Sequence, residues 1–210
     1  MVRSQPDTGE LIARASRGES LARQQLLGRH RDRLRRMIAL RLDRRLAARI
    51  DPSDVVQEAL MDAAEKLSDY LRQQPLPFYP WLRRLAWERL VKLHRRHMSA
   101  QKRSVCREQE PIPPLPNESV LKLVDLLAGS GTSPSEGLVR SELRHRVKAA
   151  LAQLPEIDQE ILAMRYLEQL SSPEISAFLE IGESAVRMRH RRALERLSRL
   201  LSGERGGQEP

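Results

Sequence analysis

The sequence predicts an all-α fold: two small helical domains joined by a flexible linker, with a helix-turn-helix in the C-terminal domain. Apolar residues recur at helical spacing along most of the 210 residues. Prolines, glycines and serines concentrate between residues 108 and 137, which is typical of a linker. Two short helical patterns joined by a tight turn follow, the second rich in arginine. We therefore expect domains at residues 1–107 and 138–203, the linker at 108–137 and a disordered tail at 204–210.

Charge and cysteine content narrow the function classes. The net charge is +9, and residues 1–105 alone hold 23 Lys and Arg against 12 Asp and Glu, so we expect a polyanion to bind there. A single cysteine, Cys106, excludes an internal disulfide and a cysteine-based zinc site. The sequence shows no signal-peptide core and no apolar run long enough to span a bilayer. We expect a cytoplasmic protein without a membrane partner, a metal or another cofactor.

The N-terminal domain is expected to begin with short helices, followed by a longer one. Asp51 and Pro52 favour a helix start, because an Asp side chain caps free amides and proline fits the first helical position. This helix should run to about Leu67 and present an acidic outer face that includes Asp54, Gln57 and Glu58. On a basic domain, such a face indicates either a surface that favours solubility or a docking site for a basic groove of another protein.

The stretch from Phe78 to Arg96 is the strongest sign of nucleic-acid binding. Four of the seven aromatic residues lie between positions 78 and 87, and six basic residues share the stretch. Aromatic rings stack on unpaired bases, while arginine and lysine hold the phosphates beside them. Because prolines interrupt this region, we expect a loop through Tyr79 and a helix that begins near Pro80 or Trp81. The same pattern also fits a buried helix with a solvated basic face.

The C-terminal domain is expected to hold four helices, of which the last two form the helix-turn-helix. One begins at Ser172, and the next runs from about Glu183 to Leu201. Helical spacing places a buried seam at Val186, His190, Ala193 and Leu197. The opposite side of the first turns should face a major groove with Ser184, Arg187, Met188 and Arg191. We expect phosphate contacts from three further arginines, which are better placed for them: Arg189, Arg192 and Arg196.

In order and spacing, four segments resemble the extracytoplasmic-function (ECF) group of bacterial sigma factors of the sigma-70 class. LIARASRGES is similar to the opening helix of that family. DPSDVVQEALMDAAEKL resembles its polymerase-docking segment. FYPWLRRLAWERLVKLHRR resembles the segment that recognises and melts the minus-ten promoter element. The segment from Leu154 to Leu197 resembles the domain that reads the minus-thirty-five element.

The resemblance implies partners and roles. The partners are promoter DNA, core RNA polymerase through its largest and flap-bearing subunits, and in many members an anti-sigma protein. The polymerase-docking positions match Asp54, Gln57 and Glu58. The minus-ten positions match Phe78, Tyr79 and Trp81 for a flipped base, and Arg83, Arg84, Arg89 and Lys92 for the backbone or upstream bases. The minus-thirty-five positions match Ser184, Arg187, Met188, Arg191, Arg189 and Arg192.

Two departures from the family bear on these roles. Glu88 stands where the family usually has Asn, and Glu180 stands where a glycine is common in the turn. They leave open the DNA contact at position 88 and the turn geometry.

The predicted function is therefore promoter recognition, DNA melting and transcription initiation with core polymerase, without catalytic residues of its own. The alternative is a stand-alone helix-turn-helix regulator that binds DNA without polymerase. A nuclease would need convergent carboxylates. Asp54, Glu58 and Asp62 fall on one helix stripe, and no second element supplies partners for them.

Overall fold

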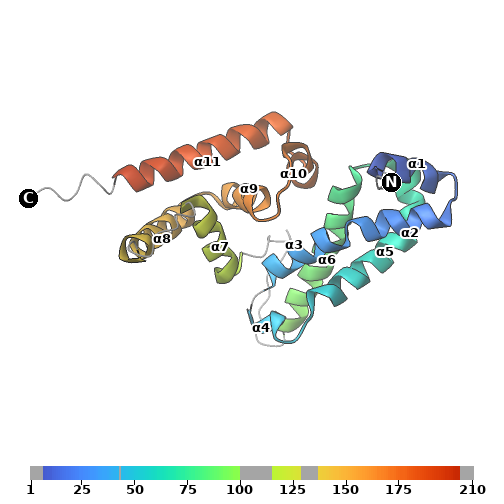
Figure 1. Cartoon of the computed structure of the whole chain (residues 1–210), viewed down its shortest axis with the longest axis horizontal. Coiled ribbons are helices and arrows are strands. Elements are labelled where there is room, and N and C mark those ends of the chain that lie inside the picture. Colours follow the sequence, from blue (N-terminus) through green and yellow to red (C-terminus); the bar gives the residue numbers. More distant parts are fainter. Residues whose placement is uncertain (1–6, 43, 100–114, 129–136, 204–210) are drawn as a thin grey trace, which may run out of the picture. The chain divides into compact units, whose positions relative to one another are not determined.

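The chain is helical throughout the part that the structure describes, as the sequence predicts. The structure, a computed structural model, describes residues 7–42, 44–99, 115–128 and 137–203, and every regular element in these ranges is an α-helix (Figure 1). The chain divides into two compact units, residues 1–114 and residues 115–210, here called the N-terminal and C-terminal units. Each unit is considered by itself.

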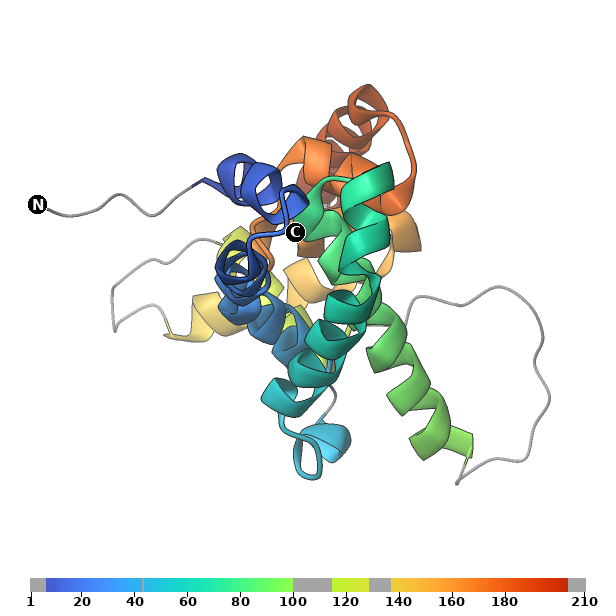
Figure 2. The ribbon, with the colours of Figure 1, turned by 90° about the vertical axis from the view of Figure 1, so that its right-hand side faces the viewer.

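The N-terminal unit is built around two long helices, α5 and α6, that lie side by side (Figure 2). Asp51 caps α5 by accepting a hydrogen bond from the Ser53 amide at 2.7 Å, and Pro52 fills the first position, as predicted. The core lies between α5, α6, α3 and the two N-terminal helices. The helices are α1 (Thr8–Ser16), α2 (Ser20–Arg29), α3 (Arg31–Arg41), α4 (Arg44–Ala47), α5 (Pro52–Gln73) and α6 (Phe78–Ser99).

Helix α6 begins earlier than the sequence predicts. Its first residue is Phe78, so Phe78 and Tyr79 belong to the first helical turn and not to a loop. The Trp81 amide already donates to the Pro77 carbonyl at 3.1 Å. Pro80 is compatible with this start, because the amide that a proline lacks would have no intrahelical partner in a first turn.

In its described residues the C-terminal unit has five helices, four of which share one apolar core. They are α7 (Asn117–Ala128), α8 (Gly137–Ala152), α9 (Glu156–Tyr166), α10 (Ser172–Leu179) and α11 (Glu183–Gly203). The sequence places α7 within the linker at 108–137, whereas the structure packs it against α8 and α9. The reason is its apolar face, since Leu123 and Val124 are buried in the same cluster as Leu162. The rest of the expected linker, residues 108–114 and 129–136, and the expected tail at 204–210 lie outside the described residues.

Helices α10 and α11 form the predicted helix-turn-helix. Ser171 and Glu174 form a capping box at the start of α10, each side chain bonding the other residue's backbone amide. Glu180 ends α10 with φ 56° and ψ 35°, so it adopts the left-handed conformation that a glycine favours at this position. The Ser176 hydroxyl donates to the Ile181 carbonyl at 2.7 Å and closes the turn. The turn geometry is therefore the usual left-handed one, although Glu replaces the glycine.

Candidate nucleic-acid interface

The aromatic residues at the start of α6 form a buried cluster. Phe78, Tyr79 and Trp81 are 3%, 4% and 9% exposed. The ring of Tyr70, from α5, stacks on Trp81 with 4.4 Å between ring centroids. The Arg33 guanidinium, from α3, lies 3.7 Å from the ring centroid of Tyr79. The rings predicted to stack on a base are thus already packed against protein groups in this conformation.

The cations of α6 divide between the core and the surface. Arg83, expected to hold DNA, is fully buried beside Trp87, which Arg41 of α3 approaches as well. Arg84 is half-buried and Lys92 is exposed, and both lie on the side that faces away from the core. The exposed Arg95 and Arg96 extend that basic surface along α6, which sequence reasoning left out of the predicted set.

Arg89 faces α5. Its Nε donates to Asp62 Oδ2 at 2.6 Å and its Nη2 to Asp62 Oδ1 at 2.5 Å. Its Nη1 lies 3.5 Å from Glu58 Oε2. The Arg89 hydrogen bonds lower the pKa of Asp62, and the same pair raises the pKa of Arg89. This predicted DNA contact is therefore engaged in an ion pair between the two long helices.

The outer face of α5 presents the predicted docking residues to solvent. Asp54, Gln57 and Glu58 are exposed, while the opposite side of the helix packs Val55, Val56 and Ala59 into the core. Met61 lies one turn beyond Glu58 on the same side and is 60% exposed. Met61 was missed by sequence reasoning, although it falls out of phase with the buried positions. We call Asp54, Gln57, Glu58, Met61 and Glu65 the α5 outer face.

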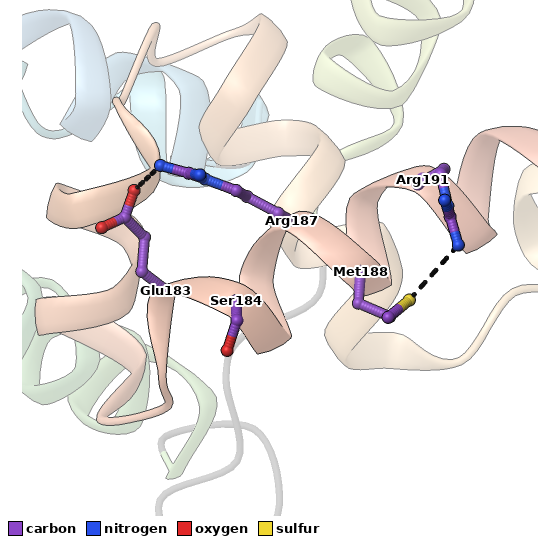
Figure 3. Close-up of a pocket in the computed structure, with 5 residues that line it drawn as sticks. All are labelled: Glu183, Ser184, Arg187, Met188 and Arg191. Carbon is purple, nitrogen blue, oxygen red and sulfur yellow. Dashed lines mark hydrogen bonds and ion pairs between the residues drawn. The ribbon is translucent and has the colours of Figure 1, made fainter.

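Helix α11 has the opposite arrangement from α6. Its seam of Val186, Ala193 and Leu197 is buried, as predicted, and His190 is half-buried. The side chains expected to face a major groove are exposed and line one shallow hollow of about 410 Å³ along the helix (Figure 3). They are Ser184, Arg187, Met188 and Arg191, together with the half-buried Glu183.

Acidic neighbours hold several of the α11 arginines. Arg187 pairs with Glu183 one turn back along the helix (Figure 3). Arg191 lies 3.4 Å from Glu195. These pairs lie at the exposed surface, so they cost little to exchange for a phosphate or a base. Arg189, predicted to contact phosphate, instead reaches Asp158 of α9 at 3.2 Å, whose side chain is only 12% exposed.

A second cavity lies between α9 and the two helices of the helix-turn-helix, α10 and α11. It has a volume of about 280 Å³ and is lined by Ile161, Arg165, Ser172, Ile175, Val186, Arg187 and His190. In a helix-turn-helix the first helix crosses the DNA backbone. Ser172 of that first helix, α10, and Arg165 of α9 line the cavity beside Arg187 of α11. Sequence reasoning missed both residues, because their position depends on how α9 and α10 pack on α11.

His190 is one of the residues that line this cavity. Its Nε2 lies 3.3 Å from the Tyr166 hydroxyl. Burial lowers the pKa of His190, and the charge of Arg165 lowers it further. The imidazole is therefore neutral near pH 7, as expected of a packing residue.

The described residues offer neither a metal site nor a membrane-spanning helix. Among the described residues, no three His, Cys, Asp or Glu side chains gather closely enough to hold a metal ion. No helix in the described ranges combines the length and the apolar character needed to cross a membrane.

Comparisons with known proteins agree with the helix-turn-helix geometry. Residues 144–197 match the family described as "Sigma-70, region 4". Over 65 residues the chain is 43% identical to the RNA polymerase sigma factor FliA of Salmonella typhimurium, a match that covers 31% of this chain and 27% of that relative. It thus spans only about a quarter of FliA.

Two further similarities extend over most of the chain. The ECF RNA polymerase sigma-E factor of Haemophilus influenzae is 27% identical over 191 residues, which cover 88% of this chain and 90% of the relative. Among solved structures, CnrH in complex with the cytosolic domain of CnrY is similar with a TM-score of 0.49 and 22% identity, covering 92% of this chain and 96% of that one.

Proposed function

We propose that this chain is itself a sigma factor. Residues 144–197 match sigma-70 region 4, and the predicted resemblance to the ECF sigma factors is confirmed. It binds core RNA polymerase, directs it to promoters, opens the DNA and allows transcription to start. The polymerase supplies the bond chemistry, and this chain acts by binding alone. Its place of action is then the cytoplasm.

The exposed face of α11 carries the proposal. Ser184, Arg187, Met188 and Arg191 project from the second helix of a helix-turn-helix, the element that enters a major groove. Arginine there can bond two acceptors of a guanine, and a methionine can pack on a thymine methyl group. Each good contact is worth about 1–3 kcal/mol of discrimination. Arg165 and Ser172 flank this face on one side and would contact phosphate there, and the exposed Arg192 is a further phosphate contact on α11 itself.

The α5 outer face is the proposed polymerase-docking surface. Asp54, Gln57 and Glu58 offer carboxylate and amide groups to a basic groove, and Met61 adds an exposed apolar centre. Charge complementarity speeds encounter and selects the partner. An acidic surface would repel DNA, so a protein partner explains it better than DNA does.

Strand opening is assigned to α6, in two layers. Arg84 and Lys92, with Arg95 and Arg96, supply the outer basic surface for the backbone. Trp81 and its buried neighbours can accept a flipped base only after Tyr70 leaves the face of Trp81. Stacking contributes about 1–3 kcal/mol per base, while flipping a base costs a few. Base capture therefore depends on energy from polymerase docking and phosphate contacts.

The rival function is a regulator that binds duplex DNA without polymerase, which the open face of α11 would also permit. A pull-down with core RNA polymerase separates the two functions, comparing wild type with an Asp54→Ala/Gln57→Ala variant. We expect the wild type to be retained and the variant to be lost. Gel shifts with and without core polymerase complete the test, and tight specific binding by the chain alone, with no retention by polymerase, would favour the rival.

A further inference from the structure

The arginine at position 89 is fully committed to the helix opposite its own. Its three guanidinium nitrogens reach carboxylates of α5: two form a fork on Asp62 at 2.6 and 2.5 Å, and the third lies 3.5 Å from Glu58. A forked arginine–carboxylate pair has stronger and more directional bonds than a single contact. A phosphate could take the forked edge of Arg89 only by displacing Asp62.

The electrostatic surroundings keep this arrangement in place. The hydrogen bonds from Arg89 lower the pKa of Asp62, and the charges of Lys66 and Lys92 act in the same direction. Asp62 therefore stays ionised at neutral pH. The Arg89 side chain is only 31% exposed and that of Asp62 only 23%, so the fork is partly shielded from water and salt.

We infer that Arg89 is a positioning residue for the docking of a basic protein surface, and not a DNA contact. Asp62 fixes Arg89, and Arg89 holds the carboxylate of Glu58 in place on the α5 outer face. This inference rests on the proposed function, because it gives the partner of that face a further determinant from the neighbouring helix. It also moves one cation from the DNA surface of α6 to the polymerase surface of α5.

The benefit to docking is preorganisation. A glutamate side chain loses rotamer freedom when a partner fixes it, and a residue that already restrains it reduces that loss. Glu58 remains 57% exposed, so its carboxylate stays accessible on the outer side. An ionised carboxylate has about four acceptor positions, and Arg89 occupies one edge only. A lysine or arginine of the partner can therefore still bind.

The test measures the affinity of the full-length chain for core RNA polymerase in the absence of DNA. We expect Arg89→Ala and Asp62→Asn each to weaken that affinity by up to about fivefold, the scale of a partly exposed ion pair. Arg89→Lys should bind core polymerase nearly as weakly as Arg89→Ala, because a lysine cannot form the fork. The double variant Glu58→Ala/Arg89→Ala should bind no more weakly than Glu58→Ala alone, because the two residues act through one carboxylate.

The matched control is Arg72→Ala. Arg72 also pairs with a carboxylate of α5, Asp69, but lies two turns beyond Glu65, near the C-terminal end of that helix. It should bind core polymerase as the wild type does. Both tryptophans, Trp81 and Trp87, lie in the N-terminal unit, so urea unfolding followed by tryptophan fluorescence shows that each variant is folded in the assay.

The results distinguish a positioning role of Arg89 from a direct contact with DNA. If Arg89→Ala binds core polymerase like the wild type but loses affinity for promoter DNA in the assembled complex, Arg89 is a DNA contact and the inference is wrong. If the losses from Glu58→Ala and Arg89→Ala add in full, Arg89 does not act through Glu58, and the inference is also wrong. Failure of the wild type to bind core polymerase would instead overturn the proposed function. The affinity measurement on the wild type alone reveals that outcome.

Discussion

Helices α6 and α11 are both rich in cations and both expected to meet DNA, yet they present their residues in opposite ways. In α11 the groove-facing residues are exposed, and the acids that hold them lie at the surface. In α6 the aromatic residues and Arg83 are buried, and Arg89 is held by α5. A helix that reads intact duplex can be complete before DNA arrives. On the proposed function, the segment that takes a base from an opened strand keeps its binding groups buried until a partner rearranges it.

The largest effect that tests this contrast is on stability. Trp81→Ala should lower the free energy of unfolding of the N-terminal unit by about 3–5 kcal/mol, because it leaves a cavity under Tyr70. Met188→Ala, on the exposed face of α11, should change stability by less than about 0.5 kcal/mol. Urea unfolding followed by Trp87 fluorescence measures the first change and circular dichroism the second.

A folded variant then tests strand opening by the same cluster. Trp81→Phe keeps an aromatic ring and most of the volume. Relative to the wild type, it should lose more transcription initiation on a duplex template than on a pre-melted template. Equal loss on both templates would mean that Trp81 has no part in melting. A Trp81→Ala protein as stable as the wild type would show that the ring is not buried and would remove the contrast between α6 and α11.

The second effect is on duplex affinity. Arg187→Ala should cost about 1–3 kcal/mol of binding free energy on a specific promoter duplex and relax the preference at one base pair, without a change in unfolding.

Arg165→Ala should weaken binding to all sequences alike and reduce the salt slope by about one, as a phosphate contact does. Titrations of the polymerase complex at several salt concentrations measure both. If Arg165→Ala altered base preference, its assignment to phosphate would be wrong.

The sequence predicts the elements of α11 better than those of α6, for a physical reason. In α11 the apolar seam of Val186, Ala193 and Leu197 repeats with the helical period, so the opposite side must face solvent. In α6 the rings of Tyr79 and Trp81 suit burial and base stacking equally, and the sequence leaves both readings open. Whether these rings are buried depends on Tyr70 and Arg33, which come from other helices.

Contacts between residues that lie far apart in the sequence are also not predicted by local sequence patterns. Asp62 and Arg89 are 27 residues apart, and nothing in their neighbourhoods indicates the fork. Likewise, α7 follows a proline-rich segment and is predicted within a linker, but Leu123 and Val124 find the core of the C-terminal unit. Arg165 lines the cavity beside Arg187 only through the packing of α9. Each case depends on tertiary contact.

A smaller effect concerns a feature that the two helices share. The helix before each of them ends in a left-handed residue that is not glycine: Gln74, with φ 39°, before α6, and Glu180, with φ 56°, before α11. Such a conformation costs a side-chain-bearing residue about 1–2 kcal/mol, while glycine loses about 0.5–1 kcal/mol in chain entropy. Gln74→Gly and Glu180→Gly should each therefore stabilise their unit by about 0.5–1 kcal/mol. The reverse change, Gly18→Ala at φ 89°, should destabilise the N-terminal unit, and thermal unfolding checks all three variants.

The smallest effect is a pH dependence confined to the C-terminal unit. Burial and the charge of Arg165 hold the pKa of His190 below its ordinary value of about 6.5. As pH falls below about 6.5, the unfolded chain takes up a proton at this position before the folded unit does. Stability is thus fully present above that pH and is lost as pH falls toward the lowered pKa of the folded state, below which the loss levels off.

The measurement compares thermal unfolding at pH 7.5 and at pH 5.5, followed by circular dichroism, for wild type and His190→Gln. The other histidines are common to both proteins, so the difference between the two pH responses belongs to His190. We expect the variant to lose less stability on acidification than the wild type. An equal loss would mean that His190 is as hydrated as in the unfolded chain. The seam of α11 would then be more open than its contact with Tyr166 indicates, and α11 would resemble α6 in needing a partner to complete it.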